Sequence, residues 1–226
     1  QDKAHNSLLL FLREPENMRI YLTENEIKLD ERQKAKLLDI VNKLEFDSGF
    51  RVEKRFWDRL FSKIPCEENG FKGFDYEKLC GMVLFFSHKK TELLKTKLMK
   101  LLNYSDMIFY KENGISMSGL KYAHLPYGPV PEHFDMLLDK MAIDHIAHIE
   151  VMYDNGYEKH RVIPDCKFLE NIFTSEELDV LERIYLKFKD FGSIDISNYS
   201  HKEKGYSSTK SGEIISYVYA KDIQLD

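Results

Sequence analysis

The strongest constraint on the fold is a long stretch of helical periodicity that ends at a glycine and leads into a proline-rich turn. From Leu94 to Asn113 the apolar residues recur every three or four positions, which predicts an amphipathic helix with one face in the core. Asn113 and Gly114 are typical of a left-handed helix end. The apolar face of this helix must pack against other elements, so we expect a compact, mainly helical domain.

Polar residues lie at the edges of the apolar face predicted for this helix. At about 100° per residue, Asp106 falls beside Met99 at one edge, and Tyr104 falls beside Lys97 at the other. Such positions predict side chains that are half buried and half available, which suits recognition of a partner. Lys100 falls on the face opposite the apolar one.

The helix is followed by a strand-like run at residues 121–125 and by a turn that proline stiffens, PYGPVP. Pro129 and Pro131 exclude helical conformation at the residues before them, and Pro131 suits the first turn of a following helix. A rigid turn that holds Tyr127 loses little entropy on binding, and tyrosine often dominates contact energy in interfaces. The turn predicts either a partner-binding surface or residues that only pack against the helix.

Further local signals predict more helices and one small sheet. Asn155-Gly156 between two alternating apolar runs is typical of a β-hairpin, and Thr174 with Glu177 has the spacing of a capping box. We therefore predict an α+β, mainly α fold, in which a compact helical domain carries a small antiparallel β-hairpin or sheet. An N-terminal helical region precedes it, with helices expected at residues 8–24, 30–46 and 50–64.

The domain boundary is expected near residue 70, because polar residues and glycine interrupt the helical pattern between residues 65 and 73. Residues 1–70 then form the N-terminal helical region, which is a linker that follows a possible helix-turn-helix upstream of Gln1. Residues 71–226 form the main domain. In the first region Asp30 is the expected N-cap of its helix.

Composition narrows the class of function. A formal net charge of -5 and a pI near 5.9 disfavour a chain whose main task is to grip nucleic acid, since that grip is mostly neutralisation of phosphates by Lys and Arg. Hydrophobic residues at 43% and charged residues at 31% are ordinary for a globular protein, and no signal peptide or membrane span is visible. The cysteines are odd in number and widely spaced, which is typical of a reduced, cytoplasmic protein.

Motifs for catalysis or metal binding are weak. His145 and His148 have a His-x-x-His spacing, but they straddle a predicted helix end and strand start, so we expect ordinary histidines. The segment 114–119 fails the Gly-x-Ser-x-Gly pattern because Ser118 replaces its second glycine. We therefore expect no catalytic residue, no metal and no cofactor. A hydrolase or transferase of unknown type stays open as an alternative hypothesis.

Three motifs occur in a fixed order: KLMKLLNYSD, which begins at Lys97, YGPVP at 127–131, and a late segment Ser200-His201-Lys202-Glu203 followed by Thr209–Ile215. This order resembles the Panacea domain, a SocA-like antitoxin domain also met in phage-associated proteins, over roughly residues 74–224. The chain departs from that pattern where Val130 is followed directly by Pro131. It departs again at Gly205-Tyr206, where relatives usually have a proline and a tryptophan.

The resemblance implies a bacterial, non-enzymatic antitoxin that neutralises a cognate protein toxin, usually encoded beside it, by direct binding. A homo-oligomer is compatible with this function, and no membrane contact is expected. The alternative is a transcriptional regulator whose DNA-binding domain lies upstream, so that DNA is contacted only through that domain and this chain serves dimerisation or sensing. The residues that the resemblance assigns to partner binding are Lys97, Lys100, Tyr104, Asp106, Tyr127, Gly128, Pro129, His201 and Glu203.

Overall fold

The computed structural model describes residues 18, 21–23, 30–41, 60–61, 63–90, 92–154, 156–168 and 170–225. It divides the chain into two units, Gln1–Leu60 and Phe61–Asp226. In the first unit residues 31–41 are helical, and the Asp30 carboxylate accepts a hydrogen bond from the Gln33 backbone at 2.7 Å, as its predicted N-cap role requires. The helices expected at 8–24 and 50–64 fall largely outside the described residues.

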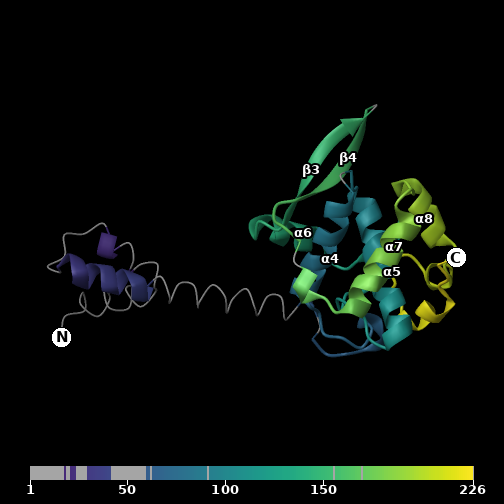
Figure 1. Cartoon of the computed structure of the whole chain (residues 1–226), viewed down its shortest axis with the longest axis horizontal. Helices are drawn as coiled ribbons and strands as arrows, with labels where there is room; N and C mark the ends of the chain where they lie inside the picture. The colour runs from purple at the N-terminus through teal and green to yellow at the C-terminus, as the bar shows by residue number, and fades with distance from the viewer. Residues whose placement is uncertain are drawn as a thin grey trace. The chain divides into compact units, whose positions relative to one another are not determined.

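The second unit is mainly helical and contains two small antiparallel sheets (Figure 1), which confirms the predicted fold class. Strand β1 (Tyr122–Leu125) pairs with β2 (Gly128–Pro131), and β3 (Ala147–Asp154) pairs with β4 (Tyr157–Pro164). No helix in the described ranges is both long and apolar enough to cross a bilayer. The helices are α4 (Tyr76–Lys89), α5 (Lys95–Asn113), α6 (Phe134–Ile143), α7 (Ser175–Phe188), α8 (Ser193–His201) and α9 (Lys204–Ser207), with 3-10 helices η1 (Glu67–Asn69), η2 (Glu170–Ile172) and η3 (Tyr217–Asp222).

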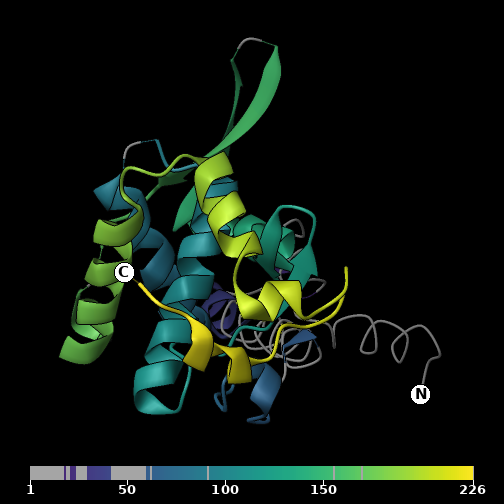
Figure 2. The ribbon, with the colours of Figure 1, turned by 90° about the vertical axis from the view of Figure 1, so that its right-hand side faces the viewer.

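Helix α5 is central to this unit (Figures 1 and 2), and its middle part is buried on all sides. Helices α4, α7 and α8, strand β2 and η3 pack against it, and every residue from Lys97 to Phe109 is buried. The prediction of a single core face is therefore wrong. The face expected to meet solvent is covered because later segments of the chain supply packing and hydrogen-bond partners for its polar side chains.

The residue types at the helix ends predict the structure there correctly. Gly114 ends α5 in the left-handed conformation, with φ of 76°. Thr174 Oγ1 accepts a hydrogen bond from the Glu177 backbone at 3.2 Å, and the Glu177 carboxylate accepts one from the Thr174 backbone at 2.8 Å. The predicted left-handed end of α5 and the predicted capping box of α7 are both confirmed.

Pro131 lies in a strand and not in a helix, so its predicted role as a helix start is wrong. It pairs opposite Tyr122 at the end of β2, and α6 begins only at Phe134, after His133 with a φ of 54°. Proline suits both an edge strand and a first helical turn, because each has positions whose backbone N–H needs no partner. The sequence pattern could not distinguish the two.

The C-terminal segment lies along the other edge of β1. Gly212 N–H donates to the carbonyl of His124 and Ile215 N–H donates to that of Tyr122, both at 2.8 Å. Strand β1 is therefore held between β2 and residues 212–215.

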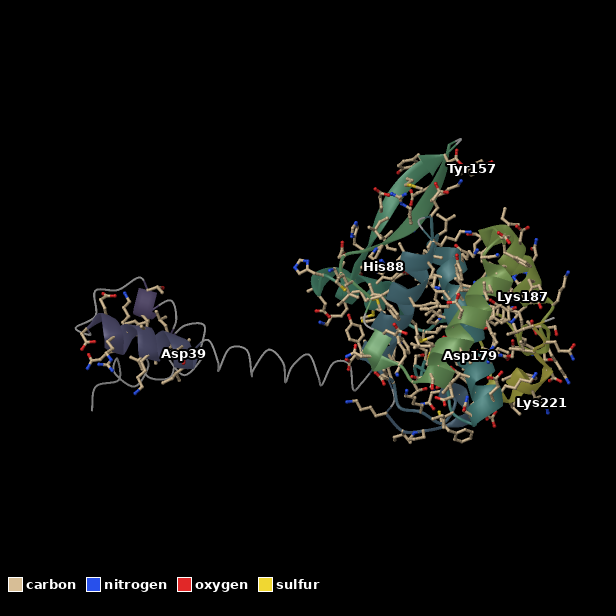
Figure 3. The ribbon with its side chains drawn as sticks, viewed as in Figure 1. Asp39, His88, Tyr157, Asp179, Lys187 and Lys221 are labelled. Carbon is tan, nitrogen blue, oxygen red and sulfur yellow. The ribbon has the colours of Figure 1, made fainter. Side chains whose placement is uncertain are left out.

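Strands β3 and β4, residues 147–154 and 157–164, form an arm that extends away from the helices (Figure 1). The base of the arm is in the core, where Ala147 and Val162 are buried. Further out, Val151 is 50% exposed and Tyr153 is 74% exposed. Tyr157 lies at the outer end of the arm (Figure 3) and is 75% exposed.

Candidate partner-binding site

The turn between β1 and β2 presents a tyrosine to solvent. Leu125 pairs with Gly128, so Pro126 and Tyr127 form a two-residue connection. The Tyr127 side chain is 73% exposed. Among the residues predicted from the sequence, Tyr127 is thus directly available to a partner.

Side chains from α8 and α9 hold this turn from beneath through its backbone carbonyls. Ser197 Oγ donates to the carbonyl of Tyr127 at 2.7 Å, and the Tyr206 hydroxyl donates to that of Leu125 at 2.9 Å. The bonds lie on either side of Pro126, whose ring already restricts φ. The turn is therefore fixed in shape by the protein itself.

Gly128 is required by two independent features of its surroundings. Its φ is 99°, in the region that side-chain-bearing residues rarely adopt. A Cβ at this position would lie 2.4 Å from Ser200 Oγ and 2.7 Å from Lys100 Cε. Because both distances are far below van der Waals contact, the hairpin can approach α5 and α8 this closely only with glycine. Pro129, the next predicted residue, is buried beside it.

Lys100 lies directly under Gly128 and carries an amine without a partner in the described part of the chain. The side chain is fully buried, and its Nζ makes no hydrogen bond to any described residue. Burial lowers the pKa of Lys100 to about 7, because the charged amine loses its hydration in the interior. The ammonium and amine forms are therefore both populated near neutral pH.

Three stacked rings join β1 to α8 and α9 beside this lysine. The Tyr206 ring lies between those of His124 and His201, with centroid distances of 3.7 and 4.4 Å. His124 Nδ1 is 3.0 Å from Thr209 Oγ1. Burial, and then the charges of Lys100 and His124, lower the pKa of His201, which keeps its ring neutral at neutral pH.

Tyr104 is fully buried and does not occupy the half-exposed position predicted for it. Its hydroxyl donates to Glu203 at 3.2 Å, and its ring packs 4.7 Å from that of Phe188. Burial and the neighbouring carboxylate raise the pKa of Tyr104, so the hydroxyl remains a donor. Burial also raises the pKa of Glu203, against the opposing effects of the Tyr104 hydrogen bond and the charge of Lys111.

Asp106 is also fully buried, which again corrects the predicted half-exposed position. It accepts hydrogen bonds from the backbone of Met117 at 2.9 Å and of Ser118 at 2.7 Å, and from the hydroxyls of Ser118 and Tyr122 at 2.5 and 2.7 Å. Burial raises the pKa of Asp106, and these four bonds oppose the rise. The carboxylate thus fixes the path from the end of α5 into β1.

Lys97 closes the end of a neighbouring helix. Its Nζ donates to the carbonyls of Phe188 and Phe191, both at 2.6 Å, where α7 ends and residues 189–192 lead into α8. Burial, and then the nearby amine of Lys90, lower the pKa of Lys97 to about 7. A lysine at this place donates to a carbonyl at the end of α7 and to one in the link that follows it.

A groove of about 430 Å³ opens beside the turn. Its walls come from the start of α5, the hairpin, and the start of α6, and most of the lining side chains are apolar. Lys95 forms an ion pair with Asp135 at this surface. The lining residues are Lys95, Thr96, Met99, Leu125, Pro126, Tyr127, Val130, Pro131, His133, Phe134, Asp135 and Met136.

The structure brings only some of the predicted residues to one place. Lys100, Gly128 and His201 gather beneath the turn that carries Tyr127, and the Tyr104–Glu203 pair lies on the same side of α5 as α8 and α9. Lys97 and Asp106 hold other parts of the fold. The anchoring of the turn by Ser197 and Tyr206 and the groove were not predictable from the sequence, because both depend on contacts between segments that lie far apart in the chain.

No group of three or more His, Cys, Asp or Glu side chains in the described ranges is arranged to hold a metal ion. His148, one of the two histidines considered in the sequence, is paired instead with Asp165 at 2.8 Å.

The segment from α5 to α9 thus contains a buried polar helix, an anchored Tyr-Gly-Pro turn and a late His-x-Glu segment that supports it. Residues 98–206 match the family model described as Antitoxin SocA-like, Panacea domain. The match covers just under half of the chain and confirms the resemblance predicted from the motifs. It contains the turn and both of its anchors, Ser197 and Tyr206. No curated protein and no solved structure is significantly similar to the chain.

Proposed function

We propose that this protein is a cytoplasmic antitoxin that neutralises a cognate protein toxin by direct binding, without catalysis. The Panacea match at residues 98–206 supports the class of function. The observation that carries the proposal is the exposure of Tyr127 on a turn that two side-chain hydrogen bonds already fix. A large side chain that is ordered before binding loses little entropy when it enters a partner.

In this proposal the nine residues predicted from the sequence act in two ways. Tyr127 contacts the toxin, together with the apolar lining of the adjacent groove. The other residues support that surface from within: Gly128 and Pro129 allow the hairpin to approach α5, with Lys100 and His201 beneath it, while Tyr104, Glu203, Asp106 and Lys97 hold the surrounding segments.

The groove has the character of a binding surface. Apolar side chains such as Met99 and Phe134 line it, and the paired charges of Lys95 and Asp135 lie with them. Protein interfaces commonly combine an apolar centre with a polar rim. We infer that an apolar side chain of the toxin occupies the groove while Tyr127 packs against the toxin surface.

The test is co-expression with the product of the adjacent open reading frame, measured by growth and by co-purification. Tyr127→Ala should weaken binding about 30-fold, since truncation of a central tyrosine costs on the order of 2 kcal/mol. Tyr157→Ala is a matched control, because that tyrosine is equally exposed but lies on the arm. It should rescue growth like the unchanged chain.

Two results would overturn the proposal. If Tyr127→Ala rescues growth and co-purifies as well as Tyr157→Ala, the turn is not the contact surface. If the full-length protein neither rescues growth nor binds the neighbouring product but represses its own promoter, the alternative of a transcriptional regulator with an upstream DNA-binding domain replaces it.

A further inference from the structure

The outer edge of β3 carries backbone groups that point away from the sheet. Val162 N–H donates to the carbonyl of Leu93 at 2.8 Å, so the backbone N–H of Val162 points away from β3. In an antiparallel pair, residues directly opposite each other point their backbone groups either toward each other or both outward, and this direction alternates along the strand. Ile149 lies opposite Val162, and therefore Ile149, Val151 and Tyr153 direct their N–H and C=O groups outward.

These outward groups have no backbone partner in the part of the chain that the structure describes. In both views of the ribbon no described segment lies beside the outer half of β3 (Figures 1 and 2). The corresponding edge of β4 is different, since residues 93–94 pair with it at Arg161 and Val162. The edge of β3 is therefore the one that another strand can join.

The same residues also form an apolar strip on one face of the arm. Side chains alternate along a strand, so Ala147, Ile149, Val151 and Tyr153 share one face. Ala147 is in the core, but Val151 and Tyr153 are at least half exposed. On β4, His160 and Glu158 form an ion pair beside this strip, and the opposite face carries ion pairs between Glu150 and Arg161 and between Asp154 and Lys159. The apolar strip of β3 thus continues beyond the body that covers its base.

A two-stranded ribbon is only marginally stable in water, and a third or fourth strand with an apolar face makes it independently stable. We propose that β3 pairs antiparallel with β3 of a second copy of this chain, with Val151 of the two copies opposite each other. The two arms then form one four-stranded sheet, in which Ile149, Val151 and Tyr153 of both copies make an apolar strip along the two central strands.

The side-chain pattern favours this occupant and this register. With Val151 at the centre, Ile149 lies opposite Tyr153 of the second copy, and His148 lies opposite its Asp154. A register centred on Glu150 would place two carboxylates directly opposite each other, and one centred on Met152 would place Glu150 against Asp154. Like charges directly opposite are destabilising, so the strand is complementary to itself in the register centred on Val151.

The test uses opposite charges at the centre of the pairing, in the full chain. Sedimentation velocity from micromolar to near-millimolar concentration should show the unchanged protein forming a dimer. Val151→Lys and Val151→Glu should each remain monomeric, since each would face its own charge. An equimolar mixture of the two should recover the dimer, because Lys and Glu then lie opposite each other.

His160→Lys is the matched control, because His160 lies beside Val151 on the same face but one strand further from the proposed axis. It should leave the dimer intact, and far-UV circular dichroism should show that all variants are folded. The proposal is overturned if the unchanged chain is monomeric throughout, if either single variant still forms the dimer, or if the mixture stays monomeric. Loss of toxin co-purification by Val151→Lys from a monomeric chain would instead assign the β3 edge to the toxin.

Discussion

The β1–β2 hairpin is short, contains two prolines in β2 and is fastened to the body by side chains of α8 and α9, whereas the arm of β3 and β4 is long, regular and in the core only at its base. Both have a two-residue connection. In the short hairpin, contacts with other elements determine the shape of the turn. In the arm, pairing between β3 and β4 continues to Asp154 and Tyr157 at its outer end.

This difference affects what each hairpin can offer to a partner. The anchored turn presents one tyrosine in a fixed position, which suits a side-chain contact. The arm presents a row of backbone groups, which suits pairing with another strand. The molecule therefore contains two surfaces of different chemistry, and each can be tested without altering the other.

The largest expected effect on stability comes from a methyl group added to the glycine of the short hairpin, compared with the same change in the arm. Gly128→Ala should lower the free energy of unfolding by about 3 kcal/mol, since the new Cβ would clash with Ser200 and Lys100 at a positive φ. Gly156 in the arm also has a positive φ, but a Cβ added there would meet no described atom within 4 Å apart from its chain neighbours. Gly156→Ala should therefore cost only about 1 kcal/mol. Urea unfolding measures both, and equal losses would show that tertiary contacts do not distinguish the two turns.

A smaller effect is expected from the amine beneath the short hairpin. Lys100→Met should raise the free energy of unfolding at pH 7 by about 2 kcal/mol, because it removes a buried charge without a described partner. Lys97→Met is the control of opposite sign, since it also removes a buried amine but takes away the side-chain donor that the carbonyls of Phe188 and Phe191 share. Urea unfolding at pH 7 measures both variants, and a loss of stability in Lys100→Met would contradict the expectation.

The same lysine should make stability depend on pH. Its pKa is about 7 in the folded chain and about 10.4 when unfolded, so the unfolded chain binds more protons between these values. The free energy of unfolding of the unchanged protein should then rise with pH above 7, by about 1 kcal/mol per unit for each such lysine. Lys100→Met should reduce this slope in urea titrations at pH 7, 8 and 9. An unchanged slope would show that Lys100 is not the titrating group.

The smallest effects on stability are expected from the anchors of the turn. Ser197→Ala and Tyr206→Phe each remove one hydrogen bond to a turn carbonyl and should lower the free energy of unfolding by about 1 kcal/mol. Each variant should reduce the free energy of toxin binding by more than it reduces the free energy of unfolding. Lys159→Gln in the arm removes an exposed ion pair and should cost less than about 0.5 kcal/mol. Thermal melts and co-purification measure the two quantities, and undiminished binding by both anchor variants would contradict the proposed role of turn rigidity.

Elements specified by neighbouring residues were predictable from the sequence. The hairpin at Asn155-Gly156, the capping box of α7 and the left-handed end of α5 each depend on a few adjacent positions. The environment of α5 was not predictable in this way. Lys97 can be buried because carbonyls at residues 188 and 191 accept hydrogen bonds from its amine. Asp106 can be buried because amides and hydroxyls at residues 117–122 donate hydrogen bonds to its carboxylate.

The candidate site shows the same division. The Tyr-Gly-Pro turn could be recognised from its residue types, and the exposed position of Tyr127 agrees with that interpretation. Ser197 carries no signal of its own, since a serine in a helix is common, and Tyr206 stood out only because relatives usually have a tryptophan at its place. Only the folded chain places their hydroxyl groups under the carbonyls of the turn.

The pairing of residues 212–215 with β1 makes the exposed tyrosine depend on a distant stretch of sequence. Removal of the chain from Gly212 onward would take away the segment that pairs with one edge of β1 and would leave the residues of the turn in place. Under the proposed function, loss of this pairing would weaken toxin binding at Tyr127 although the turn residues are unchanged.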